Sequence, residues 1–298
     1  MEHYVTLFDS LFIPQGLSLH ESLEKFAGDY TLWIICPDSS TYDIISKLNL
    51  LNVNLILLSE VETSELKIAK QNRSKVEYYY TLTPFTFKFV FETNKDIKRV
   101  TYLDADLWFR KSPKPIFKEL DKSLKYVLIT EHAYAPKFDN FASVGKFCVQ
   151  FITFTRDKGE IVRKWWEDKC IELCSSNTGG DQKYLDDWDD RFENIVHVLS
   201  NPEFCLGPWN STRFPYSNGI FYHFHGLRII KNNNILLDRN PLPKPLIVNV
   251  YIPYIKSLKY HVKKLEEIGI IQQPQIKNQG LLRTTYKIWR LKFLIFKI

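Results

Sequence analysis

The chain has 298 residues, of which 45% are hydrophobic and 25% are charged, an ordinary composition for a soluble globular protein. This length suits one large domain or two small ones. The net charge of +6 is unevenly distributed along the chain. Residues 240–298 hold 11 Lys and Arg and 2 Asp and Glu, a net charge of +9, so the preceding residues carry a net charge of −3. A nearly neutral body with a basic tail argues against a whole-protein nucleic-acid binder, which would carry a basic face on its folded domain.

The cysteine pattern and the chain's apolar runs predict a cytoplasmic location. The five cysteines are odd in number and include no C-x-x-C pair, so we expect neither a disulfide framework nor a zinc site, and a reducing compartment fits best. The first residues lack the basic and apolar regions of a secretory leader. No uncharged run of about 18 apolar residues occurs, so we expect no membrane-spanning helix.

The first sixty residues predict alternating strands and helices. We expect strands at 4–8, 31–36 and 53–58, with helices at 17–26 and 39–48 between them. This alternation is typical of βαβ units and predicts an α/β fold with a mainly parallel sheet.

The same pattern continues to a proline-rich break at 241–245. We expect the aromatic segment at 75–92 to be helical after Pro84, since proline is favoured in the first turn of a helix. Later strands are expected at 100–103, 125–130, 147–155, 195–199 and 220–224, and helices at 158–174, 181–188, 254–268 and 281–298. We therefore divide the chain into a catalytic domain, 1–245, and a helical basic extension, 246–298.

Asp104 and Asp106 directly follow the strand expected at 100–103. Ligands of open α/β sheets bind outside the carboxyl ends of the strands. Hard carboxylate oxygens suit Mg²⁺ or Mn²⁺, which completes its shell with phosphate and water. The pair therefore predicts a divalent cation that carries a diphosphate, although two aspartates in a surface turn are also a common accident.

The segment YHFHGLR contains a second set of polar groups. His223 and His225 are two residues apart, and so lie on one face of an extended strand. A nitrogen ligand beside two carboxylates fits Mn²⁺, and Arg228 is suited to contact a phosphate through two N–H groups. The alternative is that one histidine merely packs in the core.

A third set follows the flexible pair Gly179-Gly180. Asp181 and Gln182 place a carboxylate and an amide at the expected start of a helix. A simple N-cap is an equally good explanation for Asp181, because an aspartate there accepts backbone N–H bonds and favours the helix dipole.

In this order, the motifs LDAD, GDQKYLDDW and HFHG resemble the GT-A glycosyltransferases, most closely bacterial enzymes near glycosyltransferase family 8 that are found in lipopolysaccharide and capsule gene clusters. The resemblance runs from about Tyr78 to Arg228. It implies a Rossmann-like nucleotide-diphospho-sugar transferase fold, with helices on both sides of the sheet. It further implies metal ligation by Asp104, Asp106 and His223, donor contacts by Asp9, Lys88, Asp104, His225 and Arg228, and catalytic roles in the sugar and acceptor pocket for Asp181 and Gln182.

The chain departs from the family pattern at two places. Cys148-Val149-Gln150 stands where an asparagine-glycine pair is often seen, which bears on donor-sugar specificity. Leu227-Arg228 stands where K-P-W often follows the late His-Gly, so Arg228 is expected to replace the lysine on the diphosphate.

We therefore expect a glycosyltransferase that depends on Mn²⁺ or Mg²⁺. It would move a sugar from a UDP-sugar or related donor to a hydroxyl of a glycan or lipid in bacterial surface polysaccharide synthesis. The resemblance favours retention of the anomeric configuration.

The basic and aromatic faces of a helix at 281–298 suit the inner membrane surface, and docking of that helix on its own domain is the alternative. Two rival functions are a metal-dependent phosphohydrolase with Asp104 as nucleophile and a non-catalytic sugar- or partner-binding protein on the same scaffold.

Overall fold

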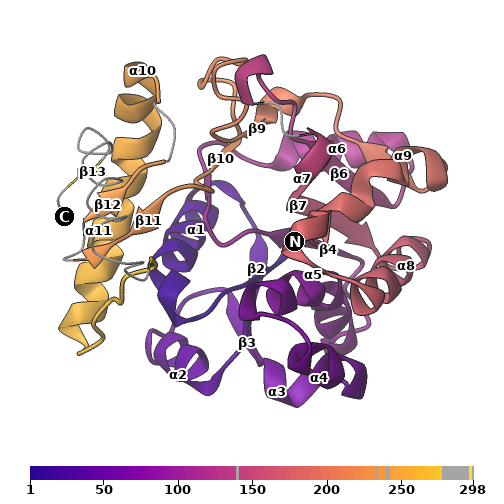
Figure 1. The fold of residues 1–298 in the computed structure, drawn as a ribbon, viewed down its shortest axis with the longest axis horizontal. Coiled ribbons are helices and arrows are strands. Elements are labelled where there is room, and N and C mark those ends of the chain that lie inside the picture. The colour runs from indigo at the N-terminus through magenta and orange to yellow at the C-terminus, as the bar shows by residue number, and fades with distance from the viewer. Residues whose placement is uncertain (139–140, 232–233, 239–241, 277–294, 297–298) are drawn as a thin grey trace.

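The computed structural model describes residues 1–138, 141–231, 234–238, 242–276 and 295–296. A seven-stranded sheet lies at its centre, in the order β3-β2-β1-β4-β7-β6-β8 (Figure 1). Only β7 runs against its neighbours β4 and β6, so the expected mainly parallel α/β sheet is confirmed. The strands are β1 (Glu2–Leu7), β2 (Tyr30–Cys36), β3 (Val53–Leu57), β4 (Arg99–Leu103), β6 (Val127–Glu131), β7 (Phe147–Thr155) and β8 (Val196–Val198).

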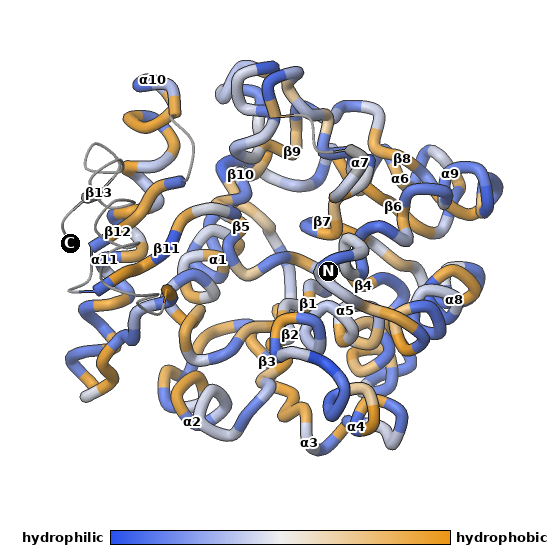
Figure 2. Tube along the Cα trace, in the orientation of Figure 1, coloured by the Kyte–Doolittle hydropathy of each residue, from blue (hydrophilic) through white to orange (hydrophobic). Residues whose placement is uncertain are grey.

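Helices cover both faces of this sheet. Successive strand residues point to opposite faces, so Tyr4 and Val5 belong to different hydrophobic clusters. Figure 2 shows hydrophilic stretches on peripheral helices such as α4 and α11. One face packs against α1 (Ile13–Phe26), α2 (Ser39–Lys47) and α6 (Lys114–Ser123), and the other against α3 (Leu58–Val61), α4 (Ser64–Gln71), α5 (Lys75–Thr93), α8 (Gly159–Glu172) and α9 (Trp188–Arg191).

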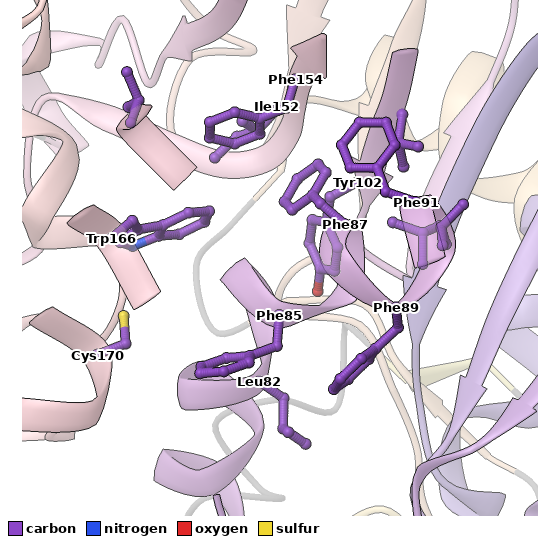
Figure 3. Close-up of a cluster of buried hydrophobic side chains, with 14 of the residues drawn as sticks. Leu82, Phe85, Phe87, Phe89, Phe91, Tyr102, Ile152, Phe154, Trp166 and Cys170 are labelled. Atoms are coloured by element: carbon purple, nitrogen blue, oxygen red, sulfur yellow. The ribbon is translucent and has the colours of Figure 1, made fainter. Parts of the chain in front are cut away.

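Helix α5 begins well before Pro84, so the expected start after that proline is wrong. A capping box starts it, in which the Ser74 hydroxyl accepts from the Glu77 N–H and the Glu77 carboxylate accepts from the Ser74 N–H. Downstream of Pro84 the helix carries a run of buried rings (Figure 3). The Phe87 ring lies 4.7 Å from that of Phe154 on β7 and 6.5 Å from that of Trp166 on α8, which fixes α5 between sheet and helix.

The segment expected to be helical at 181–188 is a 3₁₀ helix, Gln182–Asp187, that leads into α9. Further 3₁₀ turns span Ser10–Phe12, Pro136–Phe138, Ser176–Thr178 and Pro202–Phe204, and α7 spans Phe141–Val144. All five cysteines are buried and free.

Two small sheets adjoin the central one. The first contains β5 (Leu107–Phe109), β9 (Cys205–Leu206) and β10 (Phe221–His223), and the second contains β11 (Arg228–Ile229), β12 (Ile235–Leu236) and β13 (Ile295–Phe296). β13 lies in the C-terminal segment expected to be a helix, so that expectation is wrong for its two residues. Residues 277–294 and 297–298, with the predicted membrane-surface contact, lie outside the described residues.

The described part of the C-terminal extension docks on the rest of the chain. It comprises α10 (Lys244–Leu246), a π-helical turn (Ile247–Tyr251) and α11 (Ile252–Glu267), which lies beside α1 (Figure 1). The Ser257 hydroxyl donates to the Ser18 hydroxyl at 2.9 Å, and His261 lies 3.0 Å from the Glu21 carboxylate. Within the described ranges, no helix combines the length and the apolar character that crossing a membrane requires.

Candidate metal and sugar-nucleotide site

Strand pairing brings the acidic pair and the late histidine together. β4 ends at Leu103, and a tight turn follows in which the Leu107 N–H donates to the Asp104 carbonyl at 3.1 Å. The next strand, β5, pairs with β10 so that His223 lies opposite Leu107. The Phe224 N–H also donates to the Asp106 carbonyl at 3.0 Å, which locks the register.

Three ligand-type side chains converge at this point. His223 Nε2 lies 3.0 Å from Asp106 Oδ1 and 3.6 Å from Asp104 Oδ2, and the three candidate ligand atoms all lie within 4.8 Å of one another. His223 and Asp106 are buried, whereas the Asp104 side chain is 23% exposed. Two carboxylates and one imidazole, open to solvent on the Asp104 side, form a donor set that fits Mn²⁺ or Mg²⁺.

The group is strongly coupled electrostatically. Burial raises the pKa of Asp104 to about 6. Burial also acts to raise the pKa of Asp106, but the charge and hydrogen bond of His223 outweigh it and hold that pKa well below its usual range. Conversely, burial lowers and Asp106 raises the pKa of His223, with a net rise. Asp106 is therefore the carboxylate that stays ionised, and a cation would compete with the His223 proton for it.

Arg228 reaches the same group from β11. Its Nη1 lies 3.9 Å from Asp106 Oδ2, and its guanidinium lies over the Phe12 ring at 5.3 Å. The neighbouring His225 is exposed, and its ring centroid is 5.6 Å from that of His223. The predicted grouping of Arg228 and His225 with the acidic pair is therefore seen in the structure.

Asp181 is buried without full hydrogen bonding. Its side chain makes no cap hydrogen bond, and its Oδ2 is buried with no hydrogen-bond partner. The N-cap explanation is therefore wrong. Burial raises the pKa of Asp181 to about 7, with the charge of Asp104 adding to the rise. A buried carboxyl with one unpartnered oxygen, close to the charge of another carboxyl, is typical of functional sites.

Gln182 has a different environment from its neighbour. Its Nε2 donates to the Val144 carbonyl at 3.1 Å, and its Oε1 accepts from the Val149 N–H at 3.3 Å. The amide therefore ties the start of β7 to the segment before it, and supports the wall of the site through the backbone.

The two remaining predicted donor contacts, Asp9 and Lys88, stand on other elements of the fold. Asp9 follows β1, caps the 3₁₀ turn by accepting from the Leu11 N–H at 3.0 Å, and pairs with Lys75 at 2.7 Å. It therefore stands at the carboxyl edge of the sheet. Lys88 instead faces Glu92 at 3.9 Å, on α5. Tyr80, on the same helix, is close enough to Asp181 and Asp104 for their charges to act on it. Because Lys88 lies eight residues farther on, about 12 Å along the helix, the structure does not bring Lys88 to the site.

Two aromatic residues at the site, Tyr80 and Trp209, were missed from the sequence. Tyr80 packs its ring against Gly180, which has φ +66°. Burial raises the pKa of Tyr80, and the charges of Asp181 and Asp104 add to the rise. Trp209 lies edge-on to His223, at 5.3 Å between centroids, and to His132, at 5.1 Å. A single ring in an aromatic-rich sequence carries no signal of this kind, because each ring fits a core equally well.

Comparison with known proteins gives relatives and a fold. No family model matches the chain. Two Bacillus subtilis (strain 168) proteins, both described as uncharacterized, are 28% identical to it. YfnF aligns over 288 residues, which is 88% of this chain and 94% of its own length. YfnD aligns over 286 residues, which is 89% of this chain and 91% of its own length.

Solved structures of similar shape are glycosyltransferases. The galactosyltransferase LgtC, in complex with donor and acceptor sugar analogs, matches at TM-score 0.54 and 12% identity, over 87% of this chain and 95% of its own. The glycosyltransferase GlyE of Streptococcus pneumoniae TIGR4 matches at TM-score 0.53 and 14% identity, over 93% of this chain and 67% of its own. Mouse xyloside xylosyltransferase 1 matches at TM-score 0.51 and 14% identity, over 75% of this chain and 97% of its own. At these identities the likeness concerns the fold, and the chain has the GT-A fold expected from its motifs.

Proposed function

We propose that the protein is a metal-dependent glycosyltransferase that moves a sugar from a nucleotide-diphosphate donor, such as a UDP-sugar, to a hydroxyl of a glycan or lipid-linked acceptor. The observation that carries this proposal is the convergence of Asp104, Asp106 and His223 at the carboxyl end of β4 in a GT-A fold. Ligands of open α/β sheets bind at this edge.

The leaving group of such a transfer is a nucleoside diphosphate, which gains negative charge as the glycosidic bond breaks. A bound divalent cation would neutralise part of that charge. Arg228 would add a fixed positive charge, since its guanidinium is held over Phe12 and by hydrogen bonds to the carbonyls of His225 and Leu227 at 2.8 and 2.7 Å. Losing one preorganised contact of this kind typically costs about 10²–10³ in rate.

Asp181 would act on the sugar side of the site. A carboxyl whose pKa lies near 7 exchanges its proton at physiological pH. It is therefore suited either to orient the acceptor hydroxyl or to stabilise positive charge that develops on the transferred sugar. Asp9 would meet the donor nucleotide at the end of β1, and the exposed His225 would meet the diphosphate.

The family resemblance supports retention of anomeric configuration and a role in bacterial surface polysaccharide synthesis. LgtC is described as a galactosyltransferase and the mouse protein as a xylosyltransferase, so a hexose or pentose from a nucleotide donor is the substrate class to test first. The domain division at residue 245 and the cytoplasmic location stay predictions.

The test is release of nucleoside diphosphate from a panel of nucleotide sugars, with added Mn²⁺ and with chelator. Cation-dependent release of UDP or another nucleoside diphosphate supports the proposal. Hydrolysis of simple phosphomonoesters without such release would favour a phosphohydrolase instead. Sugar binding that is indifferent to chelator, without turnover, would favour a non-catalytic binding protein.

A further inference from the structure

Gln150 contacts two members of the proposed cation site at once. It lies on β7, beside β4, and is fully buried. Its side-chain Oε1 lies 3.0 Å from Nδ1 of His223, and its backbone carbonyl accepts from the Asp104 N–H at 3.1 Å. One strand residue therefore holds both the imidazole and the chain that carries the first carboxylate.

The hydrogen bond to Nδ1 decides which nitrogen of His223 is available to a cation. An amide oxygen only accepts, so Nδ1 must carry a proton to make this bond. In the neutral ring, the lone pair is then on Nε2. Nε2 is the atom that faces both carboxylates, at 3.0 Å from Asp106 and 3.6 Å from Asp104.

The surroundings offer the ring few other positions. Gln150 has no exposed surface and His223 has 4%, so solvent has little access to replace the amide. The Trp209 ring stands at 88° to the imidazole, 5.3 Å away between centroids, and restricts its rotation. Partners of this kind, which fix the orientation and tautomer of a ligating histidine, typically contribute 10–100-fold to metal affinity.

We propose that Gln150 is a positioning residue that holds His223 with Nε2 directed at Asp104 and Asp106, and so sets the affinity of the site for a divalent cation. The inference rests on the proposed function only for the presence of that cation. It also gives a physical role to the Cys148-Val149-Gln150 departure, because a glycine or alanine at 150 has no side-chain acceptor.

The first test measures Mn²⁺ alone, by electron paramagnetic resonance titration of the full-length chain. Gln150→Leu should weaken Mn²⁺ binding about 10–100-fold, whereas Gln150→Glu, which keeps an acceptor for Nδ1, should bind at least as tightly as the wild type. Because Gln150 acts through His223, Gln150→Leu should cause no further loss in a His223→Ala background. Unchanged affinity in Gln150→Leu, or a full additional loss in that background, would overturn the proposal.

A matched control separates positioning from damage to the strand. Thr153 is also buried on β7, and its hydroxyl shares a 2.9 Å hydrogen bond with Thr101. Thr153→Val removes a buried hydrogen bond of β7 without contact to His223, so Mn²⁺ affinity should stay within twofold. If Thr153→Val lost as much Mn²⁺ affinity as Gln150→Leu, any disturbance of β7 would weaken the site, and the proposal of a specific role for Gln150 would be wrong.

A second readout does not depend on a cation. Nuclear magnetic resonance of metal-free, ¹⁵N-histidine-labelled protein should show the Nδ1 proton of His223 protected from exchange in the wild type and in Gln150→Glu, and unprotected in Gln150→Leu. The same Nδ1 signal in all three would overturn the proposal. If the wild type binds no Mn²⁺, the proposed metal-dependent function fails, and this signal alone then decides whether Gln150 positions the ring.

Discussion

Replacing Asp181 by asparagine should stabilise the protein at alkaline pH while it removes activity. The carboxyl is buried with an unpartnered Oδ2 and lies within the field of Asp104, and its pKa is raised from an ordinary 3.8 to about 7. Ionisation of this group is therefore less favourable in the folded chain than in the unfolded chain. Asparagine has a similar shape and never ionises.

The sign and size of the effect follow from that pKa difference. Below pH 3.8 the carboxyl is protonated in both states, so its burial carries no ionisation penalty. As pH rises toward 7, the unfolded chain releases the proton and the folded chain keeps it, which lowers stability until the folded group also ionises. Since each pKa unit corresponds to about 1.4 kcal/mol, the stability advantage of Asp181→Asn should grow from near zero at pH 4 to about 4 kcal/mol at pH 8.

The assay is urea unfolding of wild type and Asp181→Asn at several pH values between 4 and 8, without added metal. Asp187→Asn is the control, because that half-exposed side chain pairs with Arg191 on the surface and its replacement should change stability by less than about 1 kcal/mol. A difference between Asp181→Asn and wild type that does not grow with pH would refute the reasoning about this buried carboxyl.

Three further outcomes are expected. Asp106→Asn should abolish Mn²⁺ binding and leave the circular dichroism spectrum intact, and unchanged binding would remove the metal role. His223→Ala should weaken Mn²⁺ binding more than His225→Ala, because the His223 ring is buried at 3.0 Å from Asp106 and His225 is exposed. A Mn²⁺ titration in which His225→Ala loses more affinity than His223→Ala would show that His225, and not His223, is the ligand. Gly226→Ala should lower stability by about 1–3 kcal/mol, since a Cβ there would clash with the Asp238 carboxylate, and an unchanged urea midpoint would contradict this.

The sheet was predictable where its strands are buried apolar runs. The bounds expected for 147–155 match β7, and those for 31–36 and 53–58 differ from β2 and β3 by one residue. The reversed direction of β7 was not predictable, because a fully buried strand has the same pattern in either direction. The start of α5 lies before Pro84 because the Ser74–Glu77 capping box, which begins ten residues earlier, is the stronger start signal.

The site was predictable only as far as its residues form local motifs. Asp104 and Asp106 follow one strand, and His223 stands in a recognisable His-x-x-Gly segment. Gln150 was noted only as a departure, because its partner His223 is 73 residues away and only the order of strands brings the two together. The placement of Lys88 failed for the same reason: its position on α5 is set by packing between the sheet and α8, which the motif does not encode.

The carboxyls of Asp104 and Asp181 oppose folding when they ionise. Asp104, Asp106 and Asp181 lie close enough for their charges to interact, and burial acts to raise the pKa of each. The positive charges of His223, Arg228 and His225 lower the pKa of Asp106, whereas Asp181 keeps a buried oxygen without a hydrogen-bond partner among the described residues. Neutral residues of the same size at positions 104 and 181 would therefore fold more stably at neutral pH. A divalent cation bound by Asp104 and Asp106 would reverse this balance, because its charge would favour the ionised form of the nearby carboxyls. Asp104, whose ionisation is unfavourable in the metal-free protein, is thus a group that would hold a metal and, through it, a diphosphate.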